Sequence, residues 1–153
     1  MFDRRRCYVV LAVVIAVAGV SARPGGASHL KDFPQKHRIV YQLDDAGVDK
    51  AKFVLRNISN HLSGVGSQHI EAIELVVFGP GLKSFVVKTM DPELKHMLET
   101  LQTQGLTFGA CGNTMKNFSL SLQDLPDGSK PLPQGGVVRV MELQDAGYRY
   151  LRP

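Results

Sequence analysis

The chain has 153 residues, 44% of them hydrophobic, which suits one compact domain with a core of its own. Its formal net charge is +4, but residues 3–6 supply +2 of this, and no basic stripe interleaved with aromatic residues remains to indicate nucleic-acid binding. The two cysteines, Cys7 and Cys111, are too few for a disulfide framework.

The first 22 residues have the pattern of a signal peptide. Three arginines at 4–6 precede an uncharged run at 7–20, and Ser21 and Ala22 provide small residues at a cleavage site. The uncharged run of about 14 residues is shorter than the roughly 20 needed to span a bilayer. This favours a cleaved signal and a periplasmic protein over an uncleaved membrane anchor. Residues 23–36, rich in Gly, Pro and Ser, are expected to form a flexible leader.

A strand, a helix and a second strand are expected next. Residues 39–43 are apolar enough for a buried strand. From Val48 to Leu62, apolar residues recur every three or four positions, which predicts a helix that stops near Gly64. The second strand is expected over residues 73–78, followed by a turn at Gly79-Pro80-Gly81.

A second helix and a third strand lead to Cys111. Asp91 followed by Pro92 predicts a helix start, with Asp91 as the N-cap and Pro92 in the first helical position. An apolar stripe from Leu94 to Leu101 follows. The third strand is expected over residues 106–110, directly before Cys111.

The remaining chain gives a weaker pattern. We expect a short helix over 113–122, a turn-rich loop over 126–136, a helix over 137–144 and a last strand over 148–151. Strands that alternate with helices predict an α/β fold. We expect three layers, with a mostly parallel sheet of about four or five strands and helices on both faces.

Cys111 is the main candidate for chemistry. In open α/β sheets, ligands gather at the carboxyl ends of the strands. A helix that begins near Asn113 would favour the thiolate form of Cys111, which is nucleophilic and can hold sulfur as a persulfide. Gly112 allows close approach to the sulfur, and Asn113 and Thr114 could donate hydrogen bonds to it or cap the helix. A buried, unreactive cysteine is the alternative.

Two other patterns give weaker indications of a site. The loop with Gly79 and Gly81 lacks the full glycine fingerprint of a dinucleotide site and more simply forms a tight turn that walls the Cys111 site. The five histidines show no metal-ligand spacing. We therefore expect neither a metal nor a cofactor.

Four segments resemble the DsrE/DsrF-like superfamily, in particular its small exported members. They are residues 37–42, 74–81, 110–115 and 147–153, in this order along the chain. The resemblance extends over residues 37–153 and implies a three-layer α/β domain that forms homo-oligomers. It also implies that Cys111 carries sulfane sulfur as a persulfide, passed between sulfur donors and acceptor thiols or proteins, with a possible sulfurtransferase activity.

Three hypotheses follow for the function. The first is a periplasmic protein that binds or transfers sulfur through Cys111, supported by Gly112, Asn113 and Thr114. The second is a non-catalytic oligomeric module that binds a small ligand or a partner, with Cys111 only lining the pocket. The third is a thiol-based redox or metal-binding protein. A disulfide between two subunits is the remaining redox form, because no second cysteine stays in the mature chain.

Overall fold

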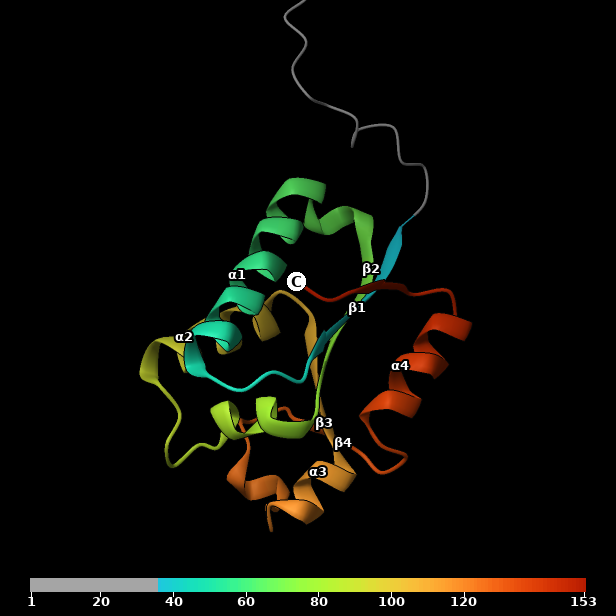
Figure 1. The fold of residues 1–153 in the computed structure, drawn as a ribbon. Coiled ribbons are helices and arrows are strands. Elements are labelled where there is room, and N and C mark those ends of the chain that lie inside the picture. Colours follow the sequence, from blue (N-terminus) through green and yellow to red (C-terminus); the bar gives the residue numbers. More distant parts are fainter. Residues whose placement is uncertain (1–35) are drawn as a thin grey trace, which may run out of the picture.

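Five parallel strands form the centre of the molecule. The computed structural model describes residues 36–153, so the signal peptide expected at 1–22 and the leader expected at 23–36, except for Lys36, lie outside the described residues. Within them, the sheet has the strand order β4-β3-β2-β1-β5 (Figure 1). The strands are β1 (His37–Leu43), β2 (Ile70–Val77), β3 (Leu106–Cys111), β4 (Lys130–Leu132) and β5 (Arg149–Leu151).

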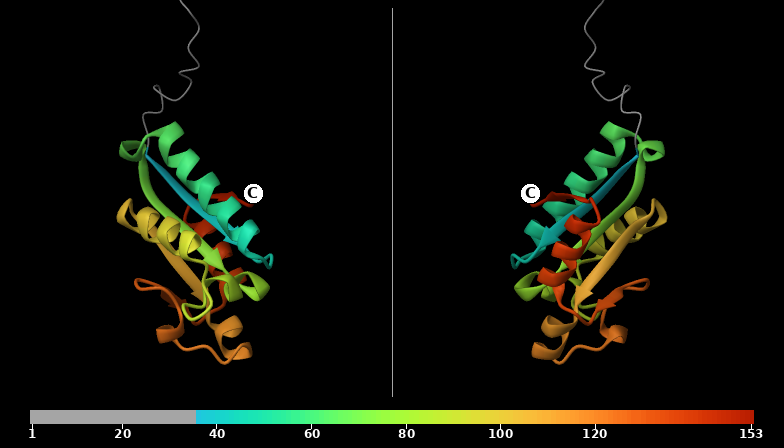
Figure 2. Two further views of the ribbon diagram at one scale, coloured as in Figure 1. Left: turned by 90° about the vertical axis from the view of Figure 1, so that its left-hand side faces the viewer. Right: turned by 90° about the vertical axis from the view of Figure 1, so that its right-hand side faces the viewer.

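Helices cover both faces of the sheet, which confirms the predicted three-layer α/β fold. Helices α1 (Val48–Val65) and α2 (Pro92–Thr103) lie on one face, and α4 (Gly136–Asp145) lies on the other (Figure 2). Successive side chains of β1 alternate between the two layers, as strand geometry requires. Ile39 and Tyr41 belong to the core under α1 and α2, whereas Val40 belongs to the core under α4.

The first two helices form largely as expected, with one shift at a boundary. The Asp91 side chain accepts a hydrogen bond from Leu94 N–H at 3.0 Å, which confirms the predicted N-cap of α2. Helix α1 runs past Gly64, so the expected stop there is wrong by two residues. Gly66 ends the helix instead, with a φ of 85° and an N–H that donates to Leu62 O at 2.9 Å.

The helix after Cys111 is shorter than the expected 113–122. Helix α3 spans Gly112–Asn117, and a single 3₁₀ turn follows at Leu122–Asp124. Ser119 ends α3 by adopting the left-handed backbone region, with a φ of 52°. The N–H groups of Ser119 and Leu120 donate to Lys116 O and Met115 O at 3.1 and 2.8 Å, a helix-ending pattern usually built on glycine.

The segment expected to be a turn-rich loop over 126–136 contains a strand. Residues Lys130–Leu132 form β4, which pairs in parallel with the end of β3. The strand is only three residues long and includes Pro131, which cannot donate to a sheet and is tolerated because β4 is an edge strand. Neither its length nor its composition distinguishes it from a loop in the sequence.

The loops after β2 and β4 leave the sheet toward opposite faces. After β2, the 3₁₀ segment Gly79–Phe85 buries Leu82 and Phe85 in the core under α1 and α2. After β4, the chain enters α4 on the other face. The carboxyl end of β3, where Cys111 lies, is therefore flanked by two diverging segments. No helix within residues 36–153 is long and apolar enough to cross a membrane.

Candidate functional site

An open pocket of about 260 Å³ lies at the carboxyl ends of β2, β3 and β4. Three segments line it: Phe78 and Gly79 after β2, Cys111, Asn113 and Thr114 at the start of α3, and residues 134–138 at the start of α4. None of the lining side chains carries a formal charge. The pocket therefore brings the thiol of Cys111 to a neutral, partly apolar recess.

Cys111 is the last residue of β3, and its position combines burial with access to the pocket. The residue is 5% exposed, and it is the only cysteine among the residues that the structure describes. It nevertheless belongs to the pocket lining, so a small molecule in the pocket can meet it. This position leaves room for both a packing role and a reactive role.

Burial and hydrogen bonding shift the pKa of the Cys111 thiol in opposite directions. Burial by itself raises the pKa of the Cys111 thiol, because a charged sulfur is poorly solvated in the interior. Hydrogen bonds from the Thr114 hydroxyl and from three backbone N–H groups act in the opposite direction. The amides belong to Thr114, Gly136 and Asn113. Together they outweigh burial, and the pKa of Cys111 is lowered, which favours the nucleophilic thiolate.

The Thr114 hydroxyl is oriented by a second contact. Gly79 N–H, at the end of β2, donates to Thr114 Oγ1 at 2.9 Å. Because the oxygen accepts from Gly79, its own proton remains available to donate toward the Cys111 sulfur. Residues at the ends of two adjacent strands are thus joined in one chain of hydrogen bonds.

Gly112 permits the close approach of β3 and β4 behind the sulfur. A Cβ atom at Gly112 would lie 2.8 Å from the backbone oxygen of Leu132, a distance that real side chains do not tolerate. A larger residue would therefore push β4 and the loop to α4 away from Cys111, and the Gly136 N–H would move with them.

The predicted site residues do not all meet. Cys111, Asn113, Thr114 and Gly79 come together at the pocket. Gly112 lies behind it, as described, and does not line it. Gly81 lies outside it too: its N–H donates to Asp44 O at 3.1 Å, and it packs tightly against the loop that follows β1.

Two residues that shape the site were not predicted from the sequence. Gly136 supplies an amide to Cys111 from the start of α4, and the only hint was the pair Gly135-Gly136 after a stretch interpreted as a loop. The second is Glu74, a charged residue inside the apolar strand β2, where it is 5% exposed. Arg139 of α4 meets it with two hydrogen bonds, Nε to Oε1 at 3.0 Å and Nη2 to Oε2 at 2.8 Å.

The Glu74–Arg139 pair fixes the helix that carries Gly136. Arg139 lies one helical turn after Gly136, and Glu74 lies in the middle of the sheet. A bidentate pair between a carboxylate and a guanidinium is strong and directional. It therefore sets the position of the first turn of α4 over the sheet, and with it one of the donors to Cys111.

Among residues 36–153 there is no cluster of three or more His, Cys, Asp or Glu side chains that could hold a metal ion.

Comparison with known proteins gives a consistent result. A family model for the DsrE/DsrF-like family matches residues 38–153. A solved protein of unknown function from Methanobacterium thermoautotrophicum is similar with a TM-score of 0.68 and 25% identity, over 77% of this chain and 100% of that chain. No curated protein gives a significant match.

Two further solved structures share the fold. The ychN protein of E. coli has a TM-score of 0.59 and 19% identity, over 78% of this chain and 99% of its own. A conserved protein of unknown function from Bacteroides thetaiotaomicron has a TM-score of 0.57 and 17% identity, over 76% and 94%.

Proposed function

The chain belongs to the DsrE/DsrF-like family, and we propose that it holds sulfane sulfur as a persulfide on Cys111 and passes it to an acceptor thiol. The family relationship supports a sulfur-relay type of fold, and the surroundings of the thiol support Cys111 as the carrier. The observation that carries the proposal is the place of Cys111 in the lining of the pocket at the end of β3, beside the Thr114 hydroxyl and three backbone amides that lower the pKa of its thiol.

Those donors suit each stage of a sulfur transfer. Thiolate is the nucleophilic form of cysteine, and it is the form that they favour at Cys111. A persulfide carries its negative charge on the outer sulfur, which extends from Cys111 into the pocket. Backbone amides held beside the thiol by the fold can stabilise that charge with little reorganisation.

The transfer balances without an added oxidant or reductant. The Cys111 thiolate attacks the outer sulfur of a donor persulfide R–S–SH, a new S–S bond forms, and the donor S–S bond breaks. The products are Cys111–S–SH and the donor thiolate R–S⁻, and Cys111–S–SH gives up its proton to water or to the departing thiolate to become Cys111–S–S⁻. An acceptor thiolate then repeats the same attack on the outer sulfur and regenerates the Cys111 thiolate.

We also propose that this transfer takes place in the periplasm, between sulfur donors and acceptor thiols or proteins outside the cytoplasm. The signal-peptide pattern of the first 22 residues supports export. The family relationship supports relay partners in a general sense and leaves their identity open. A homo-oligomer is part of the same proposal, and light scattering on the purified protein measures it directly.

Intact-mass analysis tests the proposal. Exposure to inorganic polysulfide should add roughly 32 Da per sulfur to the protein, and a thiol reductant should remove it. Peptide mapping should place the adduct on Cys111, which separates it from Cys7 in any chain that retains its first 22 residues. The Cys111→Ser variant is the control and should gain no reducible mass on the peptide that contains position 111.

The same variant distinguishes the binding-module alternative. A sulfur carrier loses its function entirely in Cys111→Ser, whereas a module in which Cys111 only lines the pocket keeps its ligand or partner. Absence of a reducible adduct on Cys111 in the wild-type protein would overturn the sulfur-carrier proposal.

A further inference from the structure

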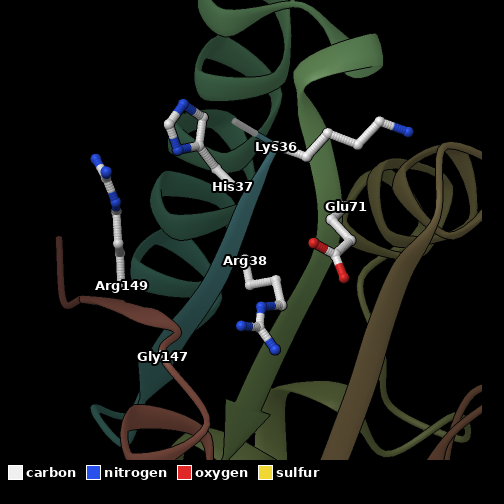
Figure 3. Close-up of a pocket in the computed structure, with 6 residues that line it drawn as sticks. All are labelled: Lys36, His37, Arg38, Glu71, Gly147 and Arg149. Atoms are coloured by element: carbon white, nitrogen blue, oxygen red, sulfur yellow. The ribbon is translucent and has the colours of Figure 1, made fainter. Parts of the chain in front are cut away.

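A second hollow, of about 390 Å³, lies at the opposite edge of the sheet from Cys111. It is found at the amino ends of β1, β2 and β5, whereas Cys111 ends β3 at the carboxyl edge (Figure 3). Its lining consists of Lys36, His37, Arg38, Glu71, Gly147 and Arg149. Five of these six side chains are ionisable, in contrast to the uncharged lining of the Cys111 pocket.

Three cations of this hollow have no acidic partner. Lys36, Arg38 and Arg149 form no ion pair within 4.0 Å with any residue in the described range. Elsewhere the protein pairs several of its cations, for example Arg152 with Asp44 at 2.9 Å. The hollow therefore concentrates positive charge that the protein itself leaves uncompensated.

The guanidinium of Arg38 is held in place while its donors stay free. Its central carbon lies 5.6 Å from the centre of the Tyr148 ring, within reach of a cation–π contact. Gly147 leaves space beside it, since a Cβ atom there would lie 3.4 Å from Arg38 Nη2. A cation fixed by an aromatic ring loses less freedom when it binds an anion.

Glu71 is the one carboxylate in the lining. Figure 3 shows the side chains of Arg38 and Glu71 extending toward each other from neighbouring strands, with Arg149 rising from β5. No ion pair joins Glu71 to Arg38 within 4.0 Å. Glu71 thus reduces the positive potential of the hollow without neutralising either arginine.

We propose that this hollow binds a small oxyanion with two negative charges. The planar fork of an arginine matches an oxyanion through two parallel N–H···O bonds, and two arginines and a lysine line this hollow. The lining offers little apolar surface, so charge and hydrogen bonding dominate recognition. The site is independent of Cys111 and of the sulfur chemistry proposed there.

Isothermal titration with inorganic phosphate tests the site. The full-length protein should bind phosphate saturably at constant ionic strength. Sulfate should bind as well, because the arginine side chains recognise the charge and shape that the two anions share. Arg38→Gln and Arg149→Gln should each weaken binding at least fivefold, about 1 kcal/mol. Glu71→Gln should strengthen it, because the variant removes the opposing charge.

A matched control guards against a general charge effect. Arg56 is exposed on α1 and has no acidic partner within the described residues, so Arg56→Gln removes the same charge away from the hollow. It should leave the affinity unchanged. An equal loss in Arg56→Gln, affinities of Arg38→Gln and Arg149→Gln within twofold of wild type, or no saturable binding of either anion would overturn the proposal.

A measurement on the wild-type protein removes dependence on the folding of variants. Phosphate should shift the backbone amide NMR signals of Gly147 and Arg149. It should leave those of Asn113 and Thr114, at the other edge of the sheet, in place. Shifts confined to the Cys111 side would place the anion in the wrong pocket and refute this assignment.

Discussion

Replacing Glu74 with glutamine tests how strongly the buried ion pair holds α4 over the sheet. The substitution keeps the shape of the side chain and removes its charge. Arg139 would keep a hydrogen-bond acceptor on β2. It would lose the carboxylate to which its Nε and Nη2 atoms donate hydrogen bonds at 3.0 and 2.8 Å. Gly109, on the neighbouring strand, already makes room for this group, because a Cβ atom there would lie 3.1 Å from Glu74 Oε1.

The expected loss of stability follows from the burial of the two partners. Removing one member of a fully buried pair costs about 3–5 kcal/mol, because the other charge stays uncompensated. The Arg139 side chain is 31% exposed, so water compensates part of its charge. A loss of about 2–3 kcal/mol, close to the value of hydrogen bonds to charged groups, is therefore expected. For a domain of this size it lowers the melting temperature by roughly 10 °C.

Urea unfolding measures this loss, and an exposed pair supplies the control. Glu99→Gln removes a carboxylate that lies 3.8 Å from Lys95 on the surface of α2, with both side chains more than half exposed. That variant should change the unfolding free energy by less than about 0.5 kcal/mol. A second readout is the rate of Cys111 alkylation, which should fall in Glu74→Gln because the Gly136 amide moves with α4.

The result that refutes this reasoning is a Glu74→Gln variant as stable as Glu99→Gln. It would mean that apolar packing of α4 alone positions the helix. A double variant, Glu74→Leu with Arg139→Met, adds a test of the same point. It should recover much of the stability lost in Glu74→Gln, because no unpaired charge remains, and it should still lack the directional contact that orients Gly136.

Two further predictions concern titrating groups. Thr114→Val removes the hydroxyl that donates to the sulfur, so the pKa of the Cys111 thiol should rise and the pH profile of iodoacetamide alkylation should move to higher pH, whereas Thr114→Ser should keep the wild-type profile. Burial, and then the charge of His37, lower the pKa of His61 below its ordinary value of 6.5. Below that pH the unfolded chain binds a proton that the folded protein does not, so stability should fall as the pH falls. His61→Gln, which can still accept a hydrogen bond from Tyr41, should show a smaller fall in melting temperature between pH 7.5 and 5, and an equal fall would exclude His61 as the cause.

Long periodic segments were predictable from the sequence because one physical requirement dominates each of them. Helix α1 must bury one stripe of apolar residues, and the spacing from Val48 to Leu62 reports that requirement directly. The cap of α2 is equally local, since Asp91 and Leu94 are three residues apart. The buried strands β1 and β3 were found for the same kind of reason.

The parts that failed depend on contacts between distant segments. Strand β4 exists because three residues, one of them proline, pair with the edge of β3, and no local pattern encodes that pairing. The end of α3 at Ser119 depends on a backbone conformation that serine seldom adopts. Gly81 was assigned to the site from its place in a loop, but its contacts are with the segment after β1.

The residues of the candidate site show the same contrast between local and distant contacts. Asn113 and Thr114 were predictable because they follow Cys111 directly in the chain. Gly136 lies 25 residues further along, and its amide reaches the sulfur only because β4 and α4 fold back over the end of β3. Sequence reasoning found the candidate cysteine and the polar groups next to it, and it missed the amide of Gly136 that tertiary structure brings near the cysteine.

The groups that lower the pKa of the Cys111 thiol come from several elements of the fold. Burial alone would raise the pKa of this thiol, and only the combined hydrogen bonds lower it below its ordinary value. Local donors come from α3, one amide comes from α4, and the Thr114 hydroxyl is oriented by Gly79 after β2. The lowered pKa therefore requires β2, β3 and α4 to be correctly assembled at once. A partly unfolded chain would lose these hydrogen bonds, so we expect the pKa of the Cys111 thiol to return toward its ordinary value when this edge of the sheet is disrupted.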